Sequence, residues 1–252
     1  MNTMKNILEL KDVSLTYQTP DDEINAIDKL NFSCDEGDFL SIIGPSGCGK
    51  TTVLSLIAGL LSPTEGKIFI GGHEKTGKED IGYMLQKDQL FPWRTIEKNI
   101  FLPLEIKKKK NRENCEKATD LLKKYGLYDF RKKNPEQLSG GMRQRVALIR
   151  TLISNPDLLL LDEPFSALDY QTRLSVTDDV YKIIKNEKKT AILVTHDISE
   201  AISMSDIIVV LTDRPAKVKS IYKPQISGNT PLRKRESPDF GLWFEKIWKE
   251  LN

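Results

Sequence analysis

The segment at residues 44–52, GPSGCGKTT, combines glycines, a lysine and two threonines directly after the apolar run 39–43. Glycines lack a Cβ, so consecutive backbone N–H groups can turn inward around phosphate oxygens, and the N-terminus of the following helix adds partial positive charge. Lys50 would bridge the outer phosphates, and the Thr51 hydroxyl would ligate Mg²⁺. The segment therefore predicts a site for a nucleoside triphosphate, lined by Gly44, Pro45, Ser46, Gly47, Cys48, Gly49, Lys50, Thr51 and Thr52.

Two adjacent carboxylates, Asp162 and Glu163, follow the apolar run 158–161. In an open α/β sheet the ligand crevice lies outside the carboxyl ends of the strands, which would place both groups beside the phosphates. Asp162 could hold Mg²⁺ through water, and Glu163 could polarise the water that attacks the γ-phosphate. A base next to a metal carboxylate favours hydrolysis over transfer to a substrate. The alternative is an acidic pair that only faces solvent at a strand end.

The segment 138–141, LSGG, precedes a helical pattern. An exposed helix N-terminus has free backbone donors and offers a second anion-binding surface. One nucleotide has no evident need for this surface in addition to the phosphate loop. Ser139, Gly140 and Gly141 are therefore interpreted as contacts to the nucleotide of another copy, which predicts a head-to-tail dimer with two-fold symmetry.

The elements that would position these residues alternate between strand and helix. Two alternating stretches, 7–17 and 24–32, predict strands on either side of the polar loop 19–23. Near-continuous apolar runs at 158–161, 191–195 and 207–211 are typical of buried parallel strands.

The middle of the chain has a helical pattern of apolar residues. Helical spacing from about 92 to 156 predicts an inserted α-helical subdomain. We therefore expect an α/β fold with a P-loop NTPase core, an antiparallel β subdomain and this helical insertion. The nucleotide-binding domain would span 1–225, and a short tail over 226–252 would carry an amphipathic helix at 240–251.

Composition narrows the partners and the compartment. The 38 basic and 36 acidic residues leave a net charge of +2, which disfavours nucleic acid as a partner. The N-terminal segment has no apolar run of the kind that a signal peptide needs, and no window reaches the ~18 apolar residues of a membrane span. Three scattered cysteines, Cys34, Cys48 and Cys115, form neither a metal pattern nor a disulfide set. These features predict a cytoplasmic chain with only peripheral membrane contact.

Six motifs occur in a specific order: the phosphate loop, Gln86, LSGG, LLLLDEP, SALD at 166–169 and THD at 195–197. Over residues 7–218 this order resembles the ATPase subunits of ABC transporters. The resemblance implies that Gln86 contacts Mg²⁺ and the attacking water and couples the site to a membrane partner. Glu163, His196 and Gln86 would form the catalytic set, with His196 holding the γ-phosphate and Glu163 in place.

The same resemblance assigns the remaining roles. Ser139 and Gly141 would cap the γ-phosphate across the dimer, and Asp169 would link the two active sites. Tyr17 resembles the aromatic residue that stacks on adenine. Met142 departs from the pattern, because many members have glutamine there; one side-chain hydrogen bond is lost, but the donors of Ser139 and Gly141 remain, so activity is still expected.

Several of these residues have simpler readings when taken alone. His196 could be a structural histidine, and Tyr17 could belong to the core. The basic run 107–110 is interpreted as a solvated helix face, with contact to anionic lipid as the alternative. The segment 91–93, FPW, could be core of the helical subdomain, or it could line the groove that in this family receives a short helix of the membrane subunit.

Residues 86–99 and 212–216 are similar to those of importers of nitrate, sulfonates, taurine and related solutes. The resemblance implies an ATP- and Mg²⁺-dependent ATPase on the cytoplasmic side of the membrane. Its partners would be transmembrane permease subunits, a second copy of itself as an ATP-dependent homodimer, and indirectly a periplasmic or extracellular solute-binding protein.

Two alternatives belong to other classes of protein. The first is a soluble ABC ATPase with a non-transport role in DNA repair, translation or cofactor assembly. A DNA-repair ATPase would carry a long coiled-coil insertion and a ribosome-acting one a second cassette, and the sequence has neither, so most versions of this alternative are disfavoured. A P-loop kinase would lack LSGG and would not need Glu163 after Asp162.

Overall fold

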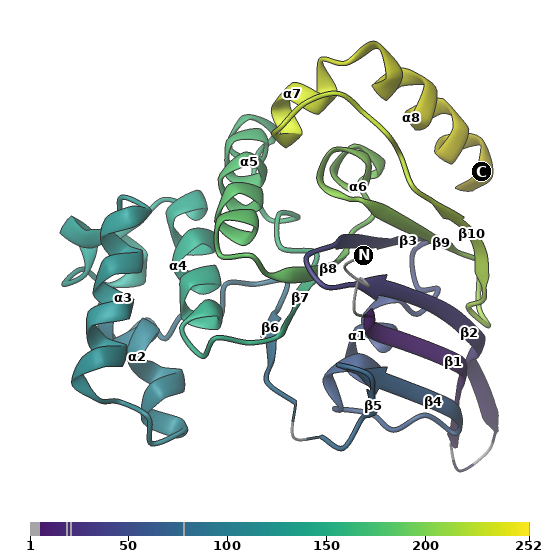
Figure 1. The fold of residues 1–252 in the computed structure, drawn as a ribbon, viewed down its shortest axis with the longest axis horizontal. Coiled ribbons are helices and arrows are strands. Elements are labelled where there is room, and N and C mark those ends of the chain that lie inside the picture. The colour runs from purple at the N-terminus through teal and green to yellow at the C-terminus, as the bar shows by residue number, and fades with distance from the viewer. Residues whose placement is uncertain (1–5, 19, 21, 78, 252) are drawn as a thin grey trace, which may run out of the picture.

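The computed structural model describes residues 6–18, 20, 22–77 and 79–251 (Figure 1). Five sets of positions lie outside the described residues: 1–5, Thr19 and Asp21 of the predicted loop, Lys78 and Asn252. Within the described part, the strands form a four-stranded and a six-stranded sheet. The predicted combination of an antiparallel and a largely parallel sheet is confirmed.

The six-stranded sheet has the strand order β10-β9-β3-β8-β7-β6, and its neighbouring strands are parallel except for β9 with β10. Strands β3, β7, β8 and β9 are buried along their whole length, which explains their near-continuous apolar sequences. The strands are β3 (Phe39–Ile43), β6 (Ile81–Met84), β7 (Leu158–Asp162), β8 (Thr190–Val194), β9 (Ile207–Leu211) and β10 (Val218–Tyr222).

The register of this sheet places the predicted site residues at the carboxyl ends of the parallel strands. Asp162, the last residue of β7, pairs with Val194, the last residue of β8. In the middle of the sheet, β3 ends at Ile43, directly before the phosphate loop. Because these strands are parallel, the segments that follow them lie at the same end of the sheet.

The four-stranded sheet has the order β2-β1-β4-β5 and is antiparallel. Its buried side chains share one hydrophobic core with α1 (Lys50–Ala58) and with one face of the larger sheet. Helix α1 is therefore fixed by both sheets. The strands are β1 (Asn6–Gln18), β2 (Glu23–Asp35), β4 (Glu65–Ile70) and β5 (His73–Glu74).

The predicted helical region forms a group beside the edge strand β6 (Figure 1). It contains α2 (Ile96–Ile106), α3 (Arg112–Lys124) and α4 (Gly140–Leu152), with short 3₁₀ turns at Tyr128–Phe130 and Pro135–Gln137. Helix α4 packs on α2 and also on α5 (Tyr170–Asn186), so it joins the helical group to the sheet. None of the helices in the described ranges is long and apolar enough to cross a membrane.

The C-terminal tail folds back over the larger sheet (Figure 1). Besides the helix predicted at 240–251, found as α8 (Pro238–Leu251), the structure contains strand β10 and the short helix α7 (Pro231–Arg235). Helix α8 packs on α6 (Ile198–Met204), and Ile247 is fully buried in a cluster with Ile43 and Ile198. The tail thus packs against the end of β3, which precedes the phosphate loop, and against the start of α6, which follows His196.

Replacing Ile247 by alanine is expected to lower the free energy of unfolding by about 2–4 kcal/mol, because it leaves a cavity in this cluster. Leu242 on the same helix is 68% exposed and provides the matched control, Leu242→Ala, for which a change below about 0.5 kcal/mol is expected. Urea denaturation of both variants measures the difference. Equal effects of the two substitutions would show that the tail is not part of the core.

Candidate functional site

The phosphate loop, residues 44–51, joins β3 to α1. Gly49 stands just before α1 with φ 118°, and Gly47 has φ 76°. Both values lie in the left-handed region that residues with a Cβ avoid, so these two turns require glycine. Gly49 also lies against the backbone of Ala26 in β2 and the side chain of Ala216. The loop is therefore held from the side of the antiparallel sheet.

Lys50, the first residue of α1, is buried with 7% of its surface exposed. Its ammonium donates to the carbonyl oxygens of Gly44 and Pro45, both at 2.8 Å. The charge is thus held inside the curve of the loop by weak neutral acceptors. Phosphate oxygens, which are charged acceptors, would compete well for these protons.

The carboxylate of Asp162 lies beside the first turn of α1. The Thr51 hydroxyl donates to Asp162 Oδ1 at 3.2 Å, and the Tyr83 hydroxyl lies 3.4 Å from Oδ2. Burial raises the pKa of Asp162 above its ordinary value, and the adjacent Glu163 adds to the rise while the bond from Thr51 opposes it. Oxygen ligands from a hydroxyl and a buried carboxylate suit Mg²⁺, which fills its other positions with water and phosphate. The residues present therefore fit the predicted cation.

Glu163 is the centre of the predicted catalytic set. Its Oε2 lies 3.2 Å from His196 Nδ1 and 3.4 Å from Gln86 Nε2. Its backbone has φ 45°, an uncommon conformation for a residue with a side chain, and its N–H donates to the carbonyl of Val194 at 2.9 Å. The structure thus brings together three residues that lie far apart in the sequence. Ser166 was not predicted as a partner; its hydroxyl accepts from Gln86 Nε2 at 3.3 Å and donates to the Glu163 carbonyl at 3.0 Å.

Gln86 contacts Glu163 and Ser166, whereas Asp162 is contacted by Thr51 and Tyr83. Among the described residues, the side chain of Gln86 is therefore bonded to the candidate base Glu163 and not to the predicted metal ligand Asp162. A direct role for Gln86 as a metal ligand stays a prediction.

The segment 138–141 differs in part from the expected open anion site. Ser139 caps α4, and its side chain accepts the N–H of Met142 at 3.3 Å, so this donor is already satisfied. Gly141 is buried, and a Cβ there would meet Val176 of α5 at 2.5 Å. Close packing of α4 on α5 is therefore one reason for this glycine. Ser139 itself is exposed, and no hydrogen bond among the described residues joins it to the phosphate loop.

Asp169 is exposed and caps α5, where its Oδ1 accepts the N–H of Thr172 at 3.0 Å. Tyr17 is 37% exposed near the end of β1 and pairs with Ile24 of β2. A Cβ at Gly49 would lie 3.6 Å from the carbonyl oxygen of Ala26 in the same β2 strand, so the hairpin that carries Tyr17 borders the phosphate loop. Tyr17 is therefore available for a ligand and is not core.

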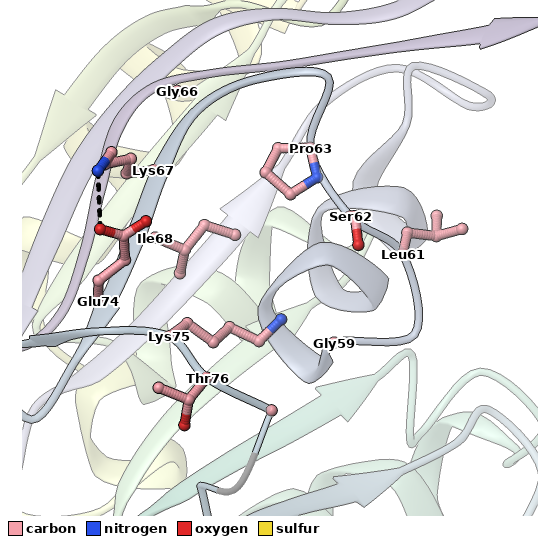
Figure 2. Close-up of a pocket in the computed structure, with 11 residues that line it drawn as sticks. Gly59, Leu61, Ser62, Pro63, Gly66, Lys67, Ile68, Glu74, Lys75 and Thr76 are labelled. Atoms are coloured by element: carbon pink, nitrogen blue, oxygen red, sulfur yellow. Dashed lines mark hydrogen bonds and ion pairs between the residues drawn. The ribbon is translucent and has the colours of Figure 1, made fainter.

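A separate cavity of about 350 Å³ lies between the C-terminal end of α1 and the β4–β5 hairpin (Figure 2). Lys75 reaches into it and donates to the carbonyl of Leu56 in the last turn of α1 at 2.8 Å, and Lys67 pairs with Glu74 at 2.8 Å. A helix C-terminus carries partial negative charge, which disfavours phosphate. Lys75 therefore caps the C-terminus of α1 in this cavity, and the predicted nucleotide site lies at the other end of the helix.

A phosphate loop between a buried parallel strand and a helix, with a hydroxyl and strand-end carboxylates beside it, defines the class of P-loop nucleoside triphosphatases. Residues 27–166 match the protein family described as ABC transporter. The chain belongs to the ABC transporter family, as the order of its motifs predicts, and it is an ATP-binding and ATP-hydrolysing subunit of that family.

Several curated proteins are similar over most of the chain. An uncharacterised ABC transporter ATP-binding protein, YtlC of Bacillus subtilis, is 49% identical over 98% of this chain and 96% of its own length. A taurine import ATP-binding protein of Roseobacter denitrificans is 35% identical over 95% and 92% of the two chains. An aliphatic sulfonates import ATP-binding protein of Bacillus cereus is 38% identical over 87% and 86%.

Among solved structures, a dimeric post-hydrolysis state of the ATP-binding cassette MJ0796, bound to ADP and phosphate, is similar with a TM-score of 0.72 and 33% identity. The match covers 87% of this chain and 99% of the cassette. The predicted fold class is thereby confirmed. The roles of individual site residues stay predictions.

Proposed function

We propose that two copies of this chain bind two MgATP molecules at their shared interface and, by closing and reopening, drive a membrane permease that imports a small solute. The single observation that carries the proposal is the cluster of Glu163, His196 and Gln86 at the carboxyl edge of the parallel sheet. The cluster combines the candidate base, Glu163, with Gln86, and the segment after Gln86 is proposed to contact the membrane partner.

In this proposal Lys50 and the loop glycines hold the phosphates, and Tyr17 stacks on adenine. Thr51 and Asp162 would hold Mg²⁺, which neutralises charge on the phosphates when bound. Glu163 accepts the proton of the attacking water, and His196 and Gln86 fix the carboxylate in position. Water is thereby aligned by groups that the fold has already ordered.

The exposed serine of the segment 138–141 supports a site completed by a second copy. Ser139 is exposed and is not bonded to the phosphate loop among the described residues, while Asp169 is exposed at the start of α5. The similar cassette of known structure was solved as a dimer. In the proposed homodimer, Ser139 and the neighbouring glycines contact the partner's ATP, and Asp169 meets the opposite copy.

An apolar groove of about 420 Å³ lies next to the Gln86 loop and supports a permease as partner. Its lining combines aliphatic and aromatic side chains with two basic residues, Lys107 and Arg150, of which Lys107 is paired with Asp80. Ile106 at its edge is 72% exposed, and nearby Trp93 is 74% exposed. The lining residues are Gln89, Phe91, Leu102, Pro103, Ile106, Lys107 and Arg150. Such a groove suits the apolar face of a short amphipathic helix, with an acidic residue of that helix near Arg150.

The groove is connected to the active site through α4. Arg150 donates to the carbonyl oxygens of Asp88 and Gln89 at 2.7 and 2.6 Å, and Arg143 pairs with the Asp88 carboxylate at 3.0 Å. Both arginines lie on the helix that Ser139 caps. A displacement of the segment after Gln86 would therefore be transmitted to α4 and to the residues that line the groove.

The solute is proposed from the relatives, which are named for import of taurine and aliphatic sulfonates. By this comparison the chain serves an importer of a small sulfonate or a similar solute such as nitrate, with the chain on the cytoplasmic side and a solute-binding protein on the outside. The permease and the binding protein, not this chain, would contact the solute.

To test the proposal, the tagged chain is purified from native membranes in mild detergent, and its companions are identified by mass spectrometry. A polytopic permease in near-equal amount is expected with wild type. It is expected to be lost with Ile106→Asp, which places a charge in the apolar groove, while ATP hydrolysis by the purified chain persists.

Leu60, which is 69% exposed after α1, gives the matched control Leu60→Asp, for which the permease should be retained. Recovery of soluble companions only, or retention of the permease by Ile106→Asp, would contradict this assignment.

A further inference from the structure

A buried carboxylate lies beneath the loop that presents His196. Glu200, in the first turn of α6, has only 3% of its surface exposed. It accepts the hydroxyl of Thr195 at 2.6 Å, and that hydroxyl oxygen in turn accepts the N–H of Asp197 at 3.0 Å. The residues on both sides of His196 are therefore fixed through one buried acceptor.

The same loop is tied to the segment that carries Asp169. Arg173 of α5 donates to the carbonyl of Leu168 at 3.0 Å, and its other terminal nitrogen lies 3.6 Å from the Asp197 carboxylate. Leu168 directly precedes Asp169, which is proposed to meet the second copy. Arg173 thus spans from the dimer-facing segment to the His196 loop.

The charges around Glu200 are arranged on several elements. Burial raises the pKa of Glu200 to about 7, and Asp197 adds to the rise, whereas Thr195, Arg173 and Arg235 oppose it. Arg235 belongs to α7 of the C-terminal tail, and one of its terminal nitrogens is buried without a hydrogen-bond partner among the described residues. The tail therefore contributes a cation to the surroundings of this carboxylate.

We infer that Glu200 is a positioning residue for His196, and that Arg173 links this position to the dimer-facing segment at Asp169. The inference rests on the proposed role of His196 in ATP hydrolysis. The Glu200 carboxylate accepts the hydroxyl of Thr195, and His196 is the next residue along the chain. The Nδ1 atom of His196 lies 3.2 Å from the Glu163 carboxylate. Without the acceptor, the imidazole loses its fixed place beside the candidate base.

The test is a double-mutant cycle on the purified full-length chain with Glu200→Ala, His196→Ala and the double variant. Glu200→Ala is expected to lower kcat about tenfold with KM for ATP unchanged, because only the loop geometry is lost and the phosphate loop is intact. In the double variant, the loss should equal that of His196→Ala alone. Glu200→Gln keeps an oxygen acceptor and should restore most of kcat.

Ser203 is also buried on α6 and donates to the Ser199 carbonyl, so Ser203→Ala is the matched control and should keep wild-type kcat. Additive losses in the double variant, or wild-type kcat in Glu200→Ala, would overturn the inference. If His196→Ala itself hydrolyses ATP at the wild-type rate, the proposed catalytic role of His196 fails instead. Should Glu200→Ala not fold, Arg173→Ala, which removes the link between Leu168 and Asp197, takes its place in the cycle with His196→Ala.

Discussion

Replacing Glu163 by glutamine is expected to lower the turnover of ATP by at least about a hundredfold, because it removes the proposed general base. Glutamine has nearly the same shape and can keep the backbone bond to Val194 and a contact to Gln86. Binding of ATP should therefore persist. Phosphate release and equilibrium binding of a fluorescent ATP analogue measure the two properties separately.

The control for this substitution is Glu136→Gln, at an exposed carboxylate in the turn before α4. It removes the same charge from the chain but should leave turnover unchanged. Turnover by Glu163→Gln at the wild-type rate would mean that another group accepts the proton of the attacking water.

The second large effect is expected for Lys50→Ala, which should weaken ATP binding by about ten- to a hundredfold, since a charge-assisted hydrogen bond to phosphate contributes about 1.5–3 kcal/mol. Hydrolysis at subsaturating ATP should fall at least as much. In the structure the ammonium is already buried within the curve of the loop, held by the carbonyls of Gly44 and Pro45. Little reorganisation is then needed when phosphate arrives. Isothermal titration with ATP gives the affinity.

Lys75 offers a matched comparison, because its ammonium also donates to a carbonyl of α1, but at the C-terminal end of the helix. Lys75→Ala is expected to lower stability modestly and to leave ATP affinity unchanged. Equal loss of affinity in both variants would indicate general damage to α1 and not removal of a phosphate ligand.

The parts of the fold that follow from local patterns could be predicted from the sequence. Strands buried on both faces need apolar residues at every position, so the run 158–161 indicates β7 directly. The phosphate loop is local as well, because its glycines and lysine are consecutive. The sequence alone therefore predicts the position of the nucleotide site.

Other features depend on contacts between distant segments, which no local pattern encodes. Strand β10 alternates between half-buried and exposed residues, but its sequence, VKSIY, does not alternate between apolar and polar side chains. Helix α7 is one short turn, so neither element has a strong periodic signal in the sequence. The partnership of Glu200 with Thr195 is close in sequence but hidden, because an isolated glutamate usually indicates an exposed helix surface. Gly141 has a packing role that its motif did not indicate, because a Cβ at this position would meet Val176 of α5.

The most direct test of the two-copy ATP site is the mass of the Glu163→Gln variant with and without MgATP, measured by size-exclusion chromatography with light scattering. The variant should bind ATP without hydrolysing it, so a dimer that forms with ATP and dissociates without it is predicted. Adding Ser139→Arg, which places a bulky side chain at the proposed contact to the partner's nucleotide, should abolish this dimer. A Glu163→Gln chain that binds ATP and remains a monomer would contradict the proposed shared site.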